Sequence, residues 1–344
     1  MTVLALPKRI ESVEHLEDLM TAPTPALVED LARAPGDIAI LGVGGKMGPT
    51  LARLAKRAAP ERRVIGVARF SEPGLRESLQ GHGIECVTAD LLDRAEVERL
   101  PRAPNVVFMA GRKFGSAGRE DLTWAMNAYV PALVAEAFAG SRIVVFSTAC
   151  VYPYVEVREG GATEAVPPIP PPGDYANSCV ARERMFQYWS NVRGTPGRLI
   201  RLSYAIDMRY GVLHDVAKKV LAGTPIDLTM GNVNVIWQGD ANSQALRSLA
   251  HCTAPTTALN VTGPEVTNIR KLALAFGQRF GVTPRFTGAE AGSAWLLDTR
   301  KAQALFGRPE VPIGTLIDWT ADWVKRGMPS LGKDTHFDVR DGKF

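Results

Sequence analysis

A glycine-rich turn between a short apolar run and a helical pattern constrains the fold more than any other feature of this chain. The turn reads Gly42-Val43-Gly44-Gly45-Lys46-Met47-Gly48, the apolar run before it covers Asp37 to Leu41, and the helical pattern after it starts at Pro49. Only glycine lets a backbone turn so tightly out of a strand and approach a pyrophosphate, and the following helix N-terminus offers free N–H groups to the anion. The order strand, glycines, helix therefore predicts a dinucleotide-binding turn, formed by Gly42, Gly44, Gly45, Lys46, Met47 and Gly48.

The residues after the turn alternate between helical and strand patterns. Leu51, Leu54, Ala55 and Ala58 recur at the spacing of one helix face. Short apolar runs that predict strands follow at Val64 to Val67, Ile84 to Thr88, Asn105 to Met109 and Arg142 to Phe146. This alternation specifies the α/β class with a parallel, doubly wound sheet, the Rossmann fold, in which ligands bind at the carboxyl ends of the strands.

The residues at the end of the second predicted strand bear on the choice of cofactor. An NAD-binding unit normally offers an acid to the adenine ribose about 20 residues beyond the glycines. Here the chain has Ala68 and Arg69 instead. A guanidinium suits a 2′-phosphate, so we expect NADP, with NAD as the alternative if Arg69 is an ordinary surface residue.

Two hydroxyl-bearing segments are candidates for chemistry. The fifth predicted strand runs directly into Ser147-Thr148-Ala149-Cys150-Val151-Tyr152, and side chains at the carboxyl end of a strand face the ligand. A proline-rich stretch follows, and then a helix opens near Tyr175. The prolines are interpreted as a stiff loop that delivers Tyr175 toward the same site.

These residues together resemble the extended short-chain dehydrogenase/reductase family, the group that includes sugar-nucleotide epimerases and dehydratases. The resemblance runs from about Asp37 to Arg326 and includes a GxxGxxG pattern at Gly42, Gly45 and Gly48. It implies that Thr148 binds the substrate oxygen and that Tyr175 is the catalytic acid or base. It also implies cofactor contacts by Asp90, Leu91, Met109, Ala110, Gly111 and Asn127.

The chain departs from this family at the catalytic YxxxK motif. Tyr175-Ala176-Asn177-Ser178 is followed by Cys179, where the family has a lysine that lowers the pKa of the tyrosine and binds the nicotinamide ribose. A neutral thiol supplies neither effect. Arg182, two helical turns beyond Tyr175, and Lys113, after the fourth strand, are each either a substitute for that ammonium or a solvated surface charge.

The parts of the chain are predicted as follows. Residues 1–36 form a helical N-terminal extension, residues 37–202 form the NAD(P)-binding Rossmann domain, and residues 203–344 form mainly a smaller C-terminal domain that resembles the family's substrate-binding domain. Within 233–262, Val235-Ile236 and Leu259-Asn260-Val261 are expected to return to the main sheet. The polar tail, Gly332 to Phe344, is expected to pack at the cleft mouth or an interface, or to be disordered.

Shorter elements are expected on either side of this core. The patterns predict helices around Ser12 to Met20, over Pro25 to Ala34, over Ile269 to Phe280 and over Ile313 to Val324. A strand pair is expected around Ile226 and Val235.

Composition excludes several classes of function. A net charge of +4, from 40 basic and 36 acidic residues without a basic block, argues against nucleic-acid binding. The five histidines lack metal-ligand spacing, so no metal is expected. No apolar run is long enough to span a membrane. The four cysteines form no CxxC pair and the N-terminus lacks a signal-peptide core, so we expect a cytoplasmic protein.

Two hypotheses from different classes remain open. The first is an NAD(P)-dependent oxidoreductase or epimerase that acts on a hydroxyl or keto group of a sugar or sugar-nucleotide-like substrate. The second is an NAD(P)-binding protein that has lost catalysis, because Cys179 replaces the lysine. The family resemblance also implies a homodimer through the helices that carry Asn127 and Tyr175, with Met185, Phe186, Tyr188 and Trp189 as the apolar surface of the second helix.

Overall fold

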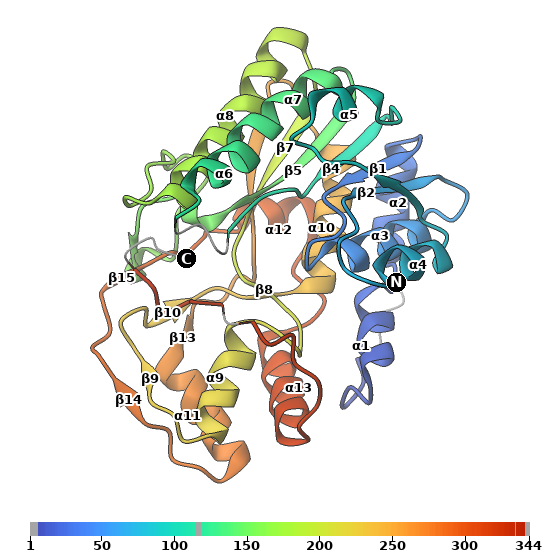
Figure 1. Cartoon of the computed structure of the whole chain (residues 1–344). Coiled ribbons are helices and arrows are strands. Elements are labelled where there is room, and N and C mark those ends of the chain that lie inside the picture. The colour runs from blue at the N-terminus through green and yellow to red at the C-terminus, as the bar shows by residue number, and fades with distance from the viewer. Residues whose placement is uncertain (1–5, 114–117, 334, 341–344) are drawn as a thin grey trace.

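A parallel sheet of seven strands forms the centre of the computed structural model, which describes residues 6–113, 118–333 and 335–340 (Figure 1). The strands lie in the order β12-β7-β5-β4-β1-β2-β3. Their bounds are β1 Ile38–Leu41, β2 Val64–Ala68, β3 Glu85–Thr88, β4 Asn105–Phe108, β5 Arg142–Thr148, β7 Gly197–Leu202 and β12 Thr257–Val261. The order reverses between β1 and β4, and a crevice opens at such a point in a doubly wound sheet. The predicted fold class is confirmed.

Helices cover both faces of the sheet because successive strand side chains point to opposite sides. One face packs against α2, α3 and α10, through Leu27, Leu31, Leu51 and Leu246 among others. The other face packs against α5, α7 and α8 through Val97, Leu133, Val134 and Phe186. The bounds of these helices are α2 Pro25–Arg33, α3 Gly48–Ala58, α5 Arg94–Arg99, α7 Val130–Ala137, α8 Asp174–Arg193 and α10 Gln238–Arg247, and the short α4, Leu75–Gly81, lies beside β3.

One helix on the second face is interrupted. Helix α6, Glu120–Trp124, continues through a π-helical turn, Ala125–Tyr129, into α7. Pro131 lies at the start of α7 and has no N–H to continue the regular hydrogen-bond ladder, which accounts for a wider turn at this point. The π turn carries Asn127 into the interior, where its side chain is fully buried.

The second half of the chain forms a smaller layer below the sheet, as Figure 1 shows. Three helices, α9 Val212–Leu221, α11 Ile269–Phe280 and α13 Ile313–Lys325, share one apolar core. Helix α12, Arg300–Phe306, returns to the Rossmann part beside β12. Short strand pairs complete this half: β8 Ala205–Ile206 with β11 Ile236–Trp237, β9 Ile226–Asp227 with β14 Phe286–Thr287, β10 Asn232–Val233 with β13 Thr267–Asn268, and β6 Val155–Glu156 with β15 Ser293–Ala294.

Two strand predictions in this half are wrong. Ile236 pairs with Ala205 of β8 and does not join the main sheet, whereas Thr257–Val261 does. The edge beside β7 is taken by β12, so Ile236 has no position there. Ile226 pairs with Phe286 and not with the segment around Val235.

The N-terminal extension links the two halves. Ser12 caps α1, Val13–Met20, and Thr24 caps α2, so both predicted helices form. Glu17 of α1 forms ion pairs with Arg53 of α3 at 2.8 Å and with Arg209, before α9, at 3.0 Å. The extension therefore braces the sheet against the smaller layer.

The C-terminal tail packs on the second half of the chain. Phe337 is buried in the core of that half, and the backbone N–H and hydroxyl of Thr335 both donate to Asp215 Oδ2, at 2.9 and 2.6 Å. Phe344 lies outside the described residues. Among the described residues, no helix combines the length and apolar character that crossing a membrane would require.

Candidate active site

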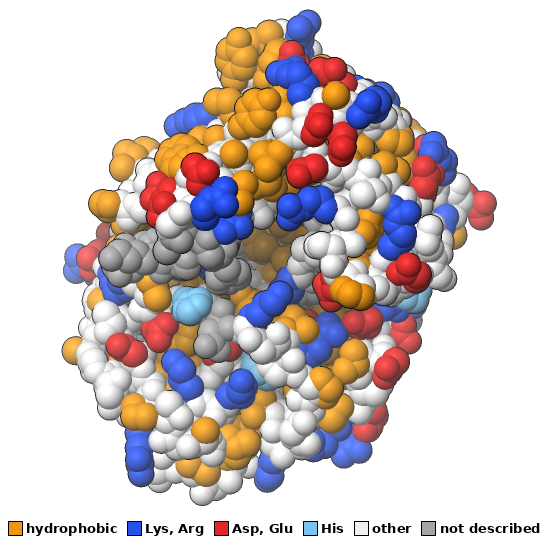
Figure 2. Space-filling model, viewed as in Figure 1, with side chains coloured by type: hydrophobic (Ala, Val, Ile, Leu, Met, Phe, Trp, Pro, Cys, Tyr) orange, Lys and Arg blue, Asp and Glu red, His pale blue; other side chains and the backbone are white. Residues whose placement is uncertain are grey.

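Two cavities meet at the carboxyl ends of the central strands, where the strand order reverses. They enclose about 260 and 290 Å³ and share Gly42, Gly45 and Met109 in their walls. Figure 2 shows the hollow on the face of the molecule, with hydrophobic side chains at its floor and Lys and Arg side chains around its rim. An elongated ligand can therefore occupy both cavities and pass over the glycine turn.

Two glycines of the turn are required by the fold itself. Gly42 has φ +91°, and a Cβ there would lie 2.6 Å from the backbone nitrogen of Ala110. A Cβ on Gly48 would lie 2.2 Å from the carbonyl oxygen of Val43. Gly48 lines neither cavity; it lets α3 begin close against the turn.

The backbone of the turn is suited to an anion. The N–H groups of Gly44, Lys46 and Met47 donate no hydrogen bond within the part of the chain that the structure describes. They lie at the N-terminus of α3, where the helix dipole is positive. Gly44 and Gly45 are exposed and line the first cavity. These groups fit the pyrophosphate of a dinucleotide, which would lie across the turn with one half in each cavity.

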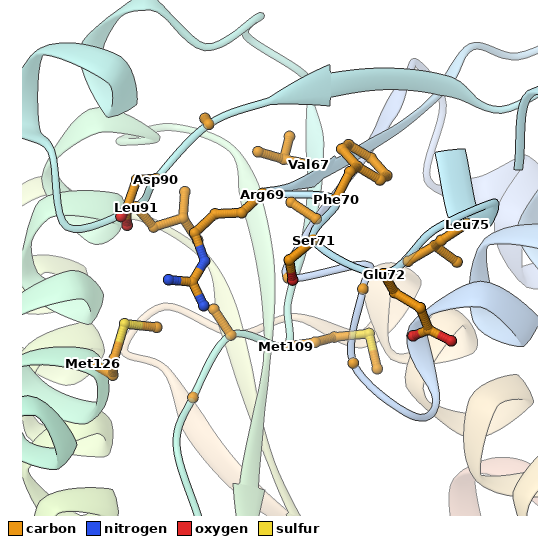
Figure 3. Close-up of a pocket in the computed structure, with 17 residues that line it drawn as sticks. Val67, Arg69, Phe70, Ser71, Glu72, Leu75, Asp90, Leu91, Met109 and Met126 are labelled. Atoms are coloured by element: carbon orange, nitrogen blue, oxygen red, sulfur yellow. The ribbon is translucent and has the colours of Figure 1, made fainter. Parts of the chain in front are cut away.

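The first cavity gathers most of the predicted cofactor residues (Figure 3). Its walls include Gly42, Gly44, Gly45, Arg69, Asp90, Leu91, Met109, Ala110 and Gly111. The Arg69 side chain extends from the end of β2 toward Leu91 and Met126, whereas Glu72 lies on the other side of the cavity. Asp90 Oδ1 accepts from the Leu92 N–H at 3.0 Å, which holds the carboxylate at the end of β3.

The sequence prediction missed several residues of this cavity, namely Phe70, Ser71, Glu72, Leu75 and Met126. Three of them, Phe70, Ser71 and Glu72, belong to the loop after β2, and Leu75 begins α4. In this fold, the loop after β2 lies at the carboxyl end of the strand and borders the ligand site. The polar pair Ser71-Glu72 just beyond the strand is the signal that could have indicated this.

The second cavity brings the two candidate catalytic residues together. Thr148, at the end of β5, and Tyr175, in the first turn of α8, both line it, together with Lys46, Met47 and Lys113. The Thr148 hydroxyl lies close enough to the Tyr175 phenol to favour its phenolate form. Burial raises the pKa of the Tyr175 phenol well above its usual value, and nearby Cys179 and Cys150 act in the same direction. The charge of Arg182 and the nearby Thr148 hydroxyl partly oppose that rise.

Cys179 lies behind Tyr175 in an apolar cluster with Ala149, Val151 and Leu297, and its side chain is fully buried. Burial is the main reason why the pKa of this thiol rises to about 11, so the thiol is neutral at physiological pH. It therefore supplies no positive charge to the site.

Arg182 is buried, and its interpretation as a solvated surface charge is wrong. Its guanidinium donates to the Phe146 carbonyl oxygen at 2.8 Å and to Asn127 Oδ1 at 2.6 Å. No carboxylate among the described residues forms an ion pair with it. The guanidinium lies so close to the loop after β4 that a Cβ on Gly111 would be 2.2 Å from one of its nitrogens.

Asn127 lines neither cavity. Its amide accepts from the Arg112 N–H and donates to the Arg112 carbonyl oxygen, both at 2.9 Å, and donates to Ser178 Oγ at 3.0 Å. Asn127 therefore anchors the loop after β4 to α8. Its contact with a cofactor stays a prediction.

A buried ion pair supports the floor of the second cavity. Arg201 of β7 donates to both carboxylate oxygens of Glu183, at 3.0 and 2.7 Å, and Ser147 Oγ donates to the same carboxylate at 2.6 Å. Arg201 also donates to the Tyr152 hydroxyl at 2.7 Å, and Tyr152 donates to Asn260 at 2.9 Å. These bonds fix β5, β7, α8 and β12 relative to one another beneath Thr148.

Comparison with known proteins agrees with this geometry. The profile of the NAD dependent epimerase/dehydratase family matches residues 38–243. No curated protein sequence matches this chain.

Solved structures of sugar-nucleotide epimerases share the fold. UDP-glucose 4-epimerase from Thermotoga maritima, solved with UDP-glucose, superposes with a TM-score of 0.68 at 17% identity, covering 85% of this chain and 99% of that one. UDP-glucuronic acid 4-epimerase from Bacillus cereus in complex with NAD superposes with a TM-score of 0.69 at 18% identity, covering 84% of this chain and 99% of that one. UDP-glucose 4-epimerase from Thermus thermophilus in complex with NAD superposes with a TM-score of 0.68 at 22% identity, covering 84% of this chain and 99% of that one. The family match over more than half of the sequence establishes that the chain belongs to the NAD-dependent epimerase/dehydratase family.

Proposed function

We propose that this protein is an NAD(P)-dependent oxidoreductase or epimerase that acts on a hydroxyl or keto group of a sugar or sugar-nucleotide-like substrate. The observation that carries the proposal is that Thr148 and Tyr175 meet in a cavity continuous with the glycine turn. The similar structures include epimerases of UDP-sugars, solved with UDP-glucose or with NAD, which supports a carbohydrate substrate.

The roles of the side chains follow from their chemistry. A bound nicotinamide would accept or return the hydride. Thr148 would hold the substrate oxygen by a hydrogen bond, and Tyr175 would exchange a proton with that oxygen. Met109 and Phe146 line the cavity and would keep bulk water from the reacting atoms.

The competing proposal is an NAD(P)-binding protein without catalysis. It accounts for Cys179 but leaves the paired hydroxyls of Thr148 and Tyr175 in the cavity without a role. Isotope transfer separates the two: a substrate deuterated at the reacting carbon should pass its label to the bound cofactor in an enzyme and keep it in a binding protein.

For the cofactor, we propose NADP, with NAD as the alternative. Arg69 is exposed at the cavity wall and forms no ion pair within the described residues, so its guanidinium is available to a 2′-phosphate. NADP should therefore bind about tenfold more tightly than NAD, and Arg69→Ala should remove that difference. Isothermal calorimetry with both cofactors measures it, with Arg285→Ala, an exposed arginine outside both cavities, as the control. A preference for NAD in the unmodified protein would overturn this assignment.

We also propose a homodimer through α6, the π turn and α8. Tyr129, Tyr188 and Val192 are about half exposed on these packed elements, at 47%, 57% and 53%. Phe186 does not belong to this surface, because its ring packs against Phe108 in the core at 5.2 Å.

Tyr188→Lys should convert the dimer to a monomer, because it places a charge in an apolar contact. Light scattering at micromolar concentration measures the mass. Leu274→Lys is the matched control, since Leu274 is similarly exposed, at 51%, but lies on α11 in the other half of the molecule. A monomeric unmodified protein, or a dimer that Tyr188→Lys leaves intact, would reject this interface.

A further inference from the structure

The active-site cavity contains a lysine that does not come from the YxxxK position on α8. Lys113 follows β4, and its side chain lines the same cavity as Thr148 and Tyr175. Its Nζ lies 5.8 Å from the centre of the Tyr175 ring. Lys113 thus places an ammonium over the face of the Tyr175 ring, whereas Cys179, one helical turn along α8, carries no charge.

Two other cations, Arg182 and Lys46, lie near the site and hold its walls in place. Arg182 lines neither cavity, and its guanidinium is bonded to Phe146 and Asn127 behind the loop after β4. Lys46 donates to the Ala205 carbonyl oxygen at 3.1 Å and lies 4.1 Å from the centre of the Tyr210 ring, so it connects the glycine turn to the smaller layer. Of these three, Lys113 is the cation that lines the cavity and has its Nζ over the Tyr175 ring.

Two thiols, one hydroxyl and two cations surround Tyr175. Cys179 and Arg182 face it from its own helix, Thr148 and Cys150 face it from the end of β5, and Lys113 faces it from the loop after β4. Burial raises the pKa of Tyr175 and of both thiols, and burial lowers the pKa of Lys113. A buried tyrosinate and a buried ammonium are each unfavourable alone, and pairing them relieves both penalties.

We propose that Lys113 supplies, from the loop after β4, the ammonium that position 179 lacks: it pairs with the Tyr175 phenolate and donates a hydrogen bond to the nicotinamide ribose. This inference rests on the proposed function: Lys113 acts on proton exchange through Tyr175 and on the cofactor directly. The site then keeps the tyrosine–cation pair of a proton-exchanging enzyme but draws the cation from a different strand end.

The test compares Lys113→Met with the double variant Lys113→Met/Cys179→Lys, which returns an ammonium one helical turn from Tyr175. Two readouts are needed: cofactor affinity by calorimetry, which requires no substrate, and the pH dependence of turnover. Lys113→Met should weaken cofactor binding about tenfold and move the midpoint of the rise of activity with pH up by about one unit. The double variant should recover most of both changes.

Further variants separate charge from structure. Lys113→Arg keeps the positive charge and should stay within about threefold of the unmodified protein in affinity. Lys271→Met removes an exposed lysine of α11 and should change neither readout. If Lys113→Met is poorly folded by circular dichroism, Lys113→Gln provides the neutral side chain.

The outcomes for Lys113 and for the proposed function are distinguishable. Unchanged cofactor affinity in neutral Lys113 variants, or a double variant no better than the single one, would overturn the role of Lys113. Absence of turnover in every variant, with cofactor affinity changing as expected, would reject the enzymatic function and leave Lys113 as a cofactor ligand.

Discussion

Tyr175→Phe is expected to lower turnover by about 10²–10⁴-fold, because proton transfer by a positioned side chain contributes a factor of that size. The phenyl ring still fills the cavity wall, so cofactor affinity should stay within about twofold. Steady-state kinetics and calorimetry on the same preparation give both numbers. Tyr188→Phe, on the exposed face of α8, is the control and should leave turnover unchanged. Full activity of Tyr175→Phe would show that the proton passes through another group.

The pH dependence of this reaction has a defined sign. For oxidation of a hydroxyl, Tyr175 has to accept a proton and is active as the phenolate. Because burial raises the pKa of Tyr175, the phenolate fraction grows with pH across the neutral range, and oxidation should accelerate toward alkaline pH. Reduction, in which the phenol donates its proton, should not show this rise.

Glu183→Ala is expected to lower the free energy of unfolding by about 3–5 kcal/mol, because it leaves the Arg201 guanidinium buried without its carboxylate. Both side chains are nearly inaccessible, and the pair is bidentate at 2.7 and 3.0 Å. Urea denaturation measures the loss. Glu98→Ala is the matched control, since the Arg94–Glu98 pair is exposed and 3.5 Å long, and should cost less than about 1 kcal/mol.

A second variant distinguishes the charge from the packing. Replacing both partners, as in Glu183→Gln/Arg201→Met, removes the isolated charge and should recover part of the stability lost in Glu183→Ala. Similar losses in Glu183→Ala and Glu98→Ala would contradict the importance of this network beneath the site.

Local patterns were sufficient for the glycine turn and for most strands of the main sheet, but they did not predict β7. The strands at Ile38, Val64 and Asn105 are short apolar runs bounded by turns, and their alternation with helices admits few topologies. The pairing of Ile236 was not predictable in this way. A two-residue strand has almost no pattern of its own, and its partner depends on which segment already occupies the sheet edge.

The candidate site was predictable where it follows directly from strand ends. Thr148 and the glycines belong to this group. The burial of Arg182 was not predictable. Its spacing of seven residues from Tyr175 fixes the side of the helix on which the side chain lies, but not whether a neighbouring loop covers it. The position of Lys113 depends in turn on the loop after β4, which Asn127 anchors through contacts between elements far apart in sequence.

The central claim is that a hydride moves between a bound nicotinamide and a carbohydrate carbon held at Thr148 and Tyr175. The most direct test mixes the protein with NADP or NAD and a panel of sugars, sugar acids and UDP-sugars, and follows the absorbance of reduced nicotinamide in single turnover. We predict that reduced nicotinamide forms with at least one member of the panel in the unmodified protein and is slowed about 10²–10⁴-fold in Tyr175→Phe. Binding of the cofactor without reduction by any member of the panel would contradict the claim and favour a nucleotide-binding protein without catalysis.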